Sequence, residues 1–135
     1  MKKSLLKIEG LGKVNSQKLK KCGVTHQASL LKSCSTRSGR KNLAKESGIS
    51  ESKILKFVNR ADLARIKGIG EEWSDLLEHS GVDTVKELAM RNAENLFEKM
   101  IKINKKKKLV RMAPSEKHLR KWIGQAKRMK RAVNY

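Results

Sequence analysis

A short glycine-rich segment occurs twice in this chain, and this repeat constrains the fold more than any other feature. Residues 8–12 read Ile-Glu-Gly-Leu-Gly, and residues 66–70, 58 positions later, read Ile-Lys-Gly-Ile-Gly. Each copy continues with a helical pattern, then Gly-Val, then a second helical pattern. The same offset pairs Leu19 with Leu77, Gly23 with Gly81, Val24 with Val82, and Leu30 with Leu88. We therefore expect two related helical units, each built around one glycine-rich turn.

Composition and spacing both favour helices. Lys, Leu, Glu, Ala and Arg dominate the chain, which contains one proline, and these residues are good helix formers. We expect an all-α fold, with a first repeat unit over residues 1–61 and a second over residues 62–135, packed into one compact domain. Relative to the first unit, the second has a Lys-rich insertion at residues 102–108, which we interpret as a loop. A basic C-terminal helix follows, with an apolar stripe at Leu119, Trp122, Ile123, Ala126 and Met129.

The charge is concentrated at the two ends of the chain. The net charge is +20 at pH 7. Residues 1–61 carry 15 Lys and Arg against 3 Asp and Glu, and residues 99–135 carry 14 against 1. Residues 62–98 carry 4 against 9 and are mildly acidic. A uniform solubilising coat would not be distributed in this way, so the pattern indicates a surface that binds a polyanion.

The glycine-rich turns supply a mechanism for that binding. A short turn that opens a helix leaves backbone N–H groups pointing outward, and with the helix dipole they can bind a phosphate oxygen. We expect Gly10, Gly12 and Lys13 to form one such site, and Lys67, Gly68 and Gly70 a second. The expected basic surface around them consists of Lys18, Lys20, Lys21, Lys105, Lys106, Lys107, Lys108, Arg111, Arg120, Lys121, Lys127 and Arg128.

The two copies differ directly after the turn. Lys13 follows the first turn, where a cation would help to hold a phosphate, whereas Glu71 and Glu72 follow the second and would repel it. The first turn is therefore the favoured contact, and at the second the glycines are expected to serve turn geometry. The lysines at 105–108 fit either a direct backbone contact or an electrostatic tether that adds affinity without fixed geometry.

Each copy of the repeat also resembles a known motif. The pattern apolar-x-Gly-apolar-Gly, followed four residues later by a small residue (Ser16 or Ser74), resembles the helix-hairpin-helix motif. In that family a hairpin joins two crossing helices, and its backbone amides contact a DNA phosphate largely without regard to base sequence. Tandem motifs form five-helix units called (HhH)2 domains, so the resemblance implies an (HhH)2-like fold and DNA binding.

Most of the chain takes part in a second resemblance. It is carried by residues 42–44, 48–50, 57–63, 65–70, 81–92, 109–111 and 114–115. In these segments the chain is similar to the DUF4332 family, a domain of unknown function. This resemblance implies tandem helix-hairpin-helix repeats and supplies no established activity.

These observations predict a non-catalytic protein that binds nucleic acid, with the backbone of duplex DNA as the favoured ligand. Structured or ribosomal RNA is an alternative, because phosphate-binding turns serve RNA equally well. A second alternative is a protein–protein adaptor that docks a basic partner on the acidic segment 71–87.

Other classes of protein find little support in the sequence. The histidines and the two cysteines show no metal-ligand spacing, and no catalytic signature or cofactor fingerprint occurs, so we expect neither a cofactor nor a metal. We expect no membrane segment and no signal peptide, and thus a cytoplasmic protein, associated with the nucleoid if its ligand is DNA.

Overall fold

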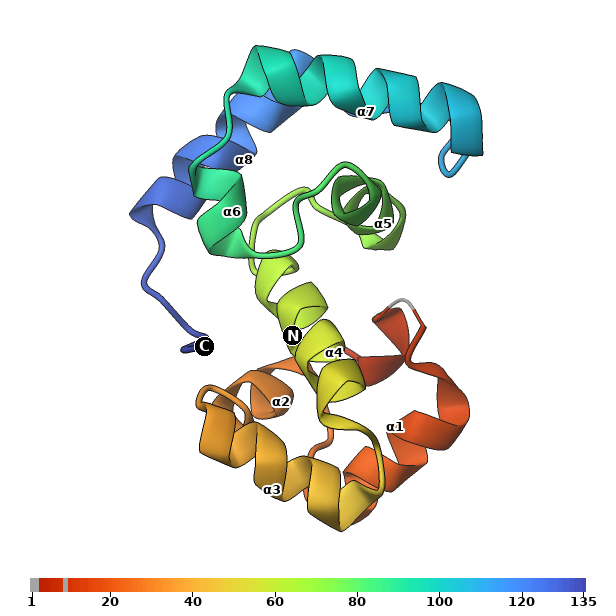
Figure 1. Ribbon diagram of the computed structural model, residues 1–135, viewed down its shortest axis with the longest axis vertical. Helices are drawn as coiled ribbons and strands as arrows, with labels where there is room; N and C mark the ends of the chain where they lie inside the picture. Colours follow the sequence, from red (N-terminus) through yellow and green to blue (C-terminus); the bar gives the residue numbers. More distant parts are fainter. Residues whose placement is uncertain (1–2, 9) are drawn as a thin grey trace. The chain divides into compact units, whose positions relative to one another are not determined.

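The computed structural model describes residues 3–8 and 10–135, and its regular elements are helices (Figure 1). They are the 3-10 turn η1 (Leu5–Lys7) and the α-helices α1 (Gly12–Lys21), α2 (Gln27–Ser33), α3 (Arg37–Ser47), α4 (Glu51–Leu63), α5 (Glu71–His79), α6 (Val85–Ala89), α7 (Ala93–Lys107) and α8 (Glu116–Arg128). Within the described residues there is no strand, although Ser4 and His26 form one isolated antiparallel bridge. The expected all-α fold is confirmed. No helix in this part of the chain has the length and apolar character needed to cross a bilayer.

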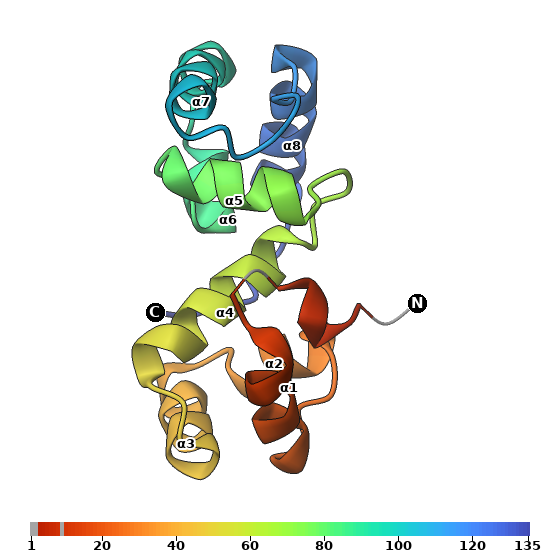
Figure 2. The same cartoon turned by 90° about the vertical axis from the view of Figure 1, so that its right-hand side faces the viewer.

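The chain divides into two compact units. The first consists of Met1–Asp62 together with Arg131–Tyr135, and the second is Leu63–Lys130. Within the second unit α8 packs against α6 and α7, and α5 packs against α7 (Figures 1 and 2). The sequence-based division placed the last five residues in the second unit. That placement was wrong, because these residues complete the core of the first.

The 58-residue repeat reappears in the backbone hydrogen bonds. In each unit a short turn leads into a helix, and the helix ends in a Schellman motif with a left-handed glycine, at φ +84° for Gly23 and +91° for Gly81. The equivalent bonds are Ile8 N to Leu5 O (3.0 Å) and Ile66 N to Leu63 O (3.1 Å), Leu11 N to Ile8 O (3.2 Å) and Ile69 N to Ile66 O (3.4 Å), Gly23 N to Lys20 O and Gly81 N to Glu78 O (3.0 Å each), and Val24 N to Leu19 O (3.0 Å) and Val82 N to Leu77 O (2.8 Å).

The same positions also form the two cores. Each unit buries one cluster of apolar side chains, and the clusters share ten equivalent places, because the repeat fixes which helix faces turn inward. Ser16 and Ser74 are also buried at equivalent places. The ten equivalent apolar pairs are Leu5 and Leu63, Ile8 and Ile66, Leu11 and Ile69, Leu19 and Leu77, Val24 and Val82, Leu30 and Leu88, and, between α4 and α8, Ile54 and Leu119, Phe57 and Trp122, Val58 and Ile123, and Ala61 and Ala126.

The segment Arg131–Tyr135, which we call the strap, docks on the first unit. Val133 is only 2% exposed and joins the core of that unit, with Ala132 packed beside it. The backbone N–H of Asn134 donates to the carbonyl oxygen of Ser35 at 2.8 Å. The strap thus combines apolar burial with a backbone hydrogen bond, which is how an extended segment is held in a fixed register.

A buried arginine connects the strap to the α2–α3 corner. Arg40, which is 5% exposed, donates to the carbonyl oxygens of Cys34 and Asn134, each at 3.0 Å. The hydroxyl of Tyr135 donates to Oδ1 of Asn59 on α4 at 2.6 Å. The Arg40 guanidinium also lies 5.9 Å from the centre of the Tyr135 ring. These contacts satisfy donors that would otherwise be costly to bury.

Residues 102–108 do not form a loop, contrary to the prediction from sequence. α7 continues to Lys107, and Lys108 ends it in a left-handed conformation with φ +48°. Lysine is a good helix former, and cations are favoured near the C-terminal carbonyls of a helix. Met100 is buried and Ile103 packs against the same core, so an apolar face continues along the helix into the lysine run.

The two cysteines are free thiols in different environments. Cys34 lies in the core of the first unit, whereas Cys22 is half-buried. Burial raises the pKa of the Cys34 thiol to about 11, although the nearby Arg40 partly opposes this shift. Because the thiolate is the reactive form, Cys34 stays protonated and inert at neutral pH.

This difference predicts selective alkylation. With iodoacetamide at pH 8 we expect Cys22 to be labelled first, and Cys34 only after addition of denaturant. Peptide mass mapping before and after denaturation measures this order. Equal labelling rates in the native protein would contradict the burial of Cys34.

Candidate nucleic-acid interface

The first glycine-rich turn faces open space at the start of α1. Gly10 and Gly12 have φ angles of +81° and +74°, which side chains other than glycine rarely adopt. A Cβ atom at either glycine would meet no atom within 4 Å. Leu11 between them is 2% exposed and anchors the turn in the core. A ligand can therefore approach the backbone of this turn closely.

The N-terminus of α1 lacks a side-chain cap. Its N-cap residue, Leu11, makes no side-chain hydrogen bond, and the first turn of α1 contains no acidic residue. The first N–H groups of an α-helix have no carbonyl partner within the helix, and the dipole makes this end positive. The exposed Lys13 adds a formal charge there. The arrangement suits an anion such as a phosphate.

Most other helices in the described part of the chain begin differently. At their N-cap, a side-chain hydroxyl or amide oxygen accepts a hydrogen bond from a backbone N–H of the first turn. Serine and threonine, as at Ser50, Thr84 and Ser115, are preferred at this position. α1 and α5, the helices that follow the two glycine-rich turns, both lack a side-chain hydrogen bond at the N-cap. The capping residues are Thr36, Ser50, Thr84, Asn92 and Ser115.

The second turn has a different backbone despite its similar sequence. Gly68 is left-handed at φ +98°, but Gly70 is extended, at φ −94° and ψ −178°. A Cβ on Gly68 would lie 3.0 Å from Nε1 of Trp122, so α8 covers this turn from one side. The backbone of Lys67 is also engaged, since its N–H donates to Oε1 of Gln125 at 3.1 Å and its carbonyl accepts from Nε2 at 3.4 Å.

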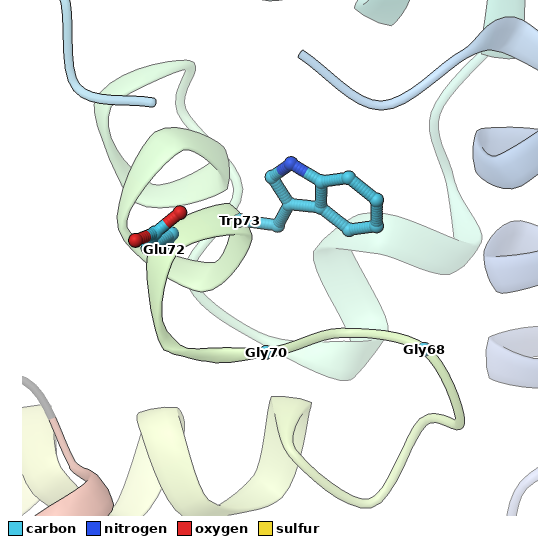
Figure 3. Close-up of a pocket in the computed structure, with 4 residues that line it drawn as sticks. All are labelled: Gly68, Gly70, Glu72 and Trp73. Carbon is cyan, nitrogen blue, oxygen red and sulfur yellow. The ribbon is translucent and has the colours of Figure 1, made fainter. Parts of the chain in front are cut away.

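An open pocket of about 370 Å³ lies beside the second turn. Gly68, Gly70, Glu72 and Trp73 line it, and Figure 3 shows the Glu72 carboxylate and the Trp73 indole on different sides of the start of α5. Nε1 of Trp73 donates to the carbonyl oxygen of Met112 at 2.9 Å, which fixes the ring. A carboxylate at the N-terminus of a helix already complements its dipole, so this turn is unsuited to a phosphate.

The expected basic residues are exposed, and we divide them into one group for each unit. In the first unit, Lys13 and Lys20 are seven residues apart on α1, nearly two turns, and lie on one face. In the second unit the group occupies the end of α7, the loop after it and α8. The exposed members are Lys13, Lys18, Lys20 and Lys21 in the first group, and Lys105, Lys106, Lys107, Lys108, Arg111, Arg120, Lys121, Lys127 and Arg128 in the second.

One of these cations has a fixed partner. Arg120 donates to Oε1 of Glu116 at 2.7 Å, and this hydrogen bond and the carboxylate charge raise the pKa of Arg120. Its charge is thus partly compensated within α8. We rank it below Lys121, Lys127 and Arg128, for which no ion pair is present among the described residues.

In the described part of the chain, no group of three or more His, Cys, Asp or Glu side chains is placed to hold a metal ion. Trp73, His118 and Trp122 instead form an aromatic cluster with ring centroids 5.2 to 6.0 Å apart. Trp122 is 2% exposed and belongs to the core of the second unit. The cluster therefore has a packing role.

Comparison with known families accounts for nearly the whole chain. The model of the family described as a domain of unknown function, DUF4332, matches residues 9–129. The chain belongs to this family. The DUF4332 match runs from the first glycine-rich turn to the end of α8 and stops before the strap. No curated protein and no solved structure matches the chain.

Proposed function

We propose that this DUF4332 domain binds nucleic acid without catalysis, with the sugar-phosphate backbone of duplex DNA as its ligand. The proposal includes a tandem helix-hairpin-helix interpretation of the two units. One phosphate would sit at the N-terminus of α1, against the backbone N–H groups that follow Gly12 and beside the ammonium group of Lys13. Contacts of this kind position a protein on a duplex without reading its bases.

The observation that carries the proposal is the open, uncapped start of α1. Two left-handed glycines with open space where a Cβ would lie, no acidic residue in the first turn of α1 and an adjacent lysine coincide there. Each supports close approach of an anion to backbone amides. The second turn lacks this combination, because Gly70 is extended and Glu72 is exposed at the start of α5. We therefore assign the phosphate contact to the first unit.

The basic surfaces supply the long-range attraction. The groups on α1 and on α7 and α8 would each neutralise phosphates and release condensed counterions, so affinity should fall steeply with salt. Aromatic side chains are only 4% of the chain, which disfavours a stacking platform for single-stranded bases. The two free thiols suit a reducing compartment, so we place the protein in the cytoplasm, at the nucleoid if the ligand is DNA.

Fluorescence anisotropy with labelled duplex DNA, single-stranded DNA and structured RNA of equal length tests the proposal. Across a salt series we expect duplex DNA to bind most tightly, with a steep linear fall of log K against log salt. Tighter binding to structured RNA would move the assignment to RNA with the same phosphate chemistry. Equal, weak binding of all three would indicate unspecific polyelectrolyte attraction and contradict the proposed site.

A protein–protein adaptor is the second candidate function, favoured by the open pocket that Glu72 and Trp73 line. The variants Glu72→Lys and Glu71→Lys distinguish the two functions. A nucleic-acid binder should bind duplex DNA equally well or about two- to threefold more tightly, because a weak repulsion becomes an attraction. An adaptor should instead lose a basic protein partner, which a pull-down with the wild-type chain and the variant would detect.

A further inference from the structure

The C-terminal end of α7 carries four consecutive lysines, Lys105 to Lys108, all of them exposed. No ion pair to these lysines is present among the described residues. The run is helical up to Lys107, where cations near the last carbonyls of the helix favour its dipole. Lys108 ends the helix, and a specific contact fixes the backbone that follows it.

That contact is a clasp between Asn104 and the backbone beyond the lysines. Nδ2 of Asn104 donates to the carbonyl oxygen of Val110 at 3.1 Å, and the N–H of Val110 donates to Oδ1 of Asn104 at 3.0 Å. The backbone N–H of Lys108 also donates to the carbonyl oxygen of Asn104 at 2.7 Å. One side chain thus pairs with both polar groups of a residue six positions later, as a neighbouring strand would.

The clasp fixes the backbone on both sides of the lysine run. On the near side the lysines continue α7, and on the far side Val110 is buried in the core of the second unit. Between them, Lys108 adopts a left-handed conformation, at φ +48°, that glycine adopts more readily. The four lysines are therefore presented on a defined backbone instead of a flexible tail.

We propose that Asn104 is a positioning residue for phosphate binding by these lysines. The inference rests on the proposed nucleic-acid function and decides between the two interpretations of the lysine run, a fixed contact or an electrostatic tether. A fixed cluster loses less conformational entropy when it meets the regularly spaced phosphates of a duplex. A flexible polyanion adapts its own shape and gains little from such order.

The test compares Asn104→Ala with Asn95→Ala in the full chain. Asn95 is an exposed amide in the first turn of the same helix, so its replacement makes the same chemical change away from the clasp. The ligands are a labelled DNA duplex and heparin, and amide hydrogen exchange at Val110 reports the clasp itself. We expect Asn104→Ala to bind the duplex about three- to tenfold more weakly, with heparin binding unchanged. Asn95→Ala should leave both affinities unchanged.

Each other outcome has a definite meaning. Wild-type duplex affinity in Asn104→Ala, with fast exchange at Val110, would overturn the inference and leave an electrostatic tether. Equal losses for duplex and heparin would also overturn it, because ordering would not be the cause. A variant with all four lysines changed to glutamine distinguishes a failure of the Asn104 inference from a failure of the proposed nucleic-acid function. If the wild-type chain binds no duplex and this variant is indistinguishable from it, the proposed function itself fails.

Discussion

Lys13→Glu should weaken duplex binding at low salt by about tenfold or more, the largest effect we expect from any single surface substitution. The change removes a cation beside the proposed phosphate and places a carboxylate over the first N–H groups of α1. A carboxylate in the first turn of a helix is favourable for the helix itself. Affinity should therefore fall while the thermal midpoint stays constant or rises slightly, and anisotropy together with circular dichroism measures both quantities.

Lys32→Glu provides the matched control. Lys32 is exposed in the last turn of α2 in the same unit, and its substitution changes the net charge equally. If binding depends on the site at α1, Lys32→Glu should cost only about two- to threefold, as expected for general electrostatics. Equal losses for the two variants would show that total charge governs binding and would contradict a specific role for the turn.

The second large effect concerns the strap. Val133→Asp should destabilise the first unit by about 3 kcal/mol, because it removes a buried valine and places a carboxylate in the core. Two hydrogen bonds should be lost as well, the one from Arg40 to the carbonyl oxygen of Asn134 in the strap and the one from Tyr135 to Asn59 on α4. Amide hydrogen exchange of the first unit, especially along α3, measures the loss as faster exchange.

Asn134→Ala provides the control for the strap. The side chain of Asn134 is exposed, and its contacts with Ser35 and Arg40 use the backbone. We expect this variant to lie within about 0.5 kcal/mol of the wild type. If Val133→Asp also changed the stability of the first unit by no more than about 0.5 kcal/mol, the strap would not be a structural part of that unit.

The repeat is the part of the fold that sequence reasoning predicted best. Glycine at Gly23 and Gly81 follows a helical pattern and precedes valine, and in both units this sequence forms the predicted helix end. Local chemistry decides such a feature, because only a residue without a Cβ enters the left-handed region at little cost. The strap could not be predicted in this way. It has five residues and no periodicity, and its place depends on contacts with Ser35, Arg40 and Asn59, which are distant in sequence.

The lysine run shows where composition misleads. A stretch of four lysines has the composition of a solvated loop, yet residues 102–107 are helical. The contact that fixes the backbone after the run, between Asn104 and Val110, spans six residues and involves one ordinary amide side chain. Its only trace in the sequence is an asparagine beside Ile103 at the start of the run. Capping by a side chain on the backbone beyond a helix has no distinctive sequence pattern.

The two glycine-rich turns mark the limit of motif-based prediction of the site. Their sequences predict the same geometry, and the charges after them predict different ligand preferences. The structure adds a difference that no motif contains, since Gly12 is left-handed and Gly70 is extended. Trp122, 54 residues after Gly68, closes one side of the second turn. Packing against a remote helix thus distinguishes two segments that look equivalent in sequence.

The most direct test of the central claim is a ¹⁵N–¹H correlation titration of the full chain with a short DNA duplex. If a phosphate sits at the start of α1, the backbone amides of Gly12, Lys13 and Val14 should show the largest shift changes, in a saturable manner. The same amides in Lys13→Glu should move far less. Large changes confined to the turn at Gly68 and Gly70, or unchanged α1 amides at saturation, would contradict the account.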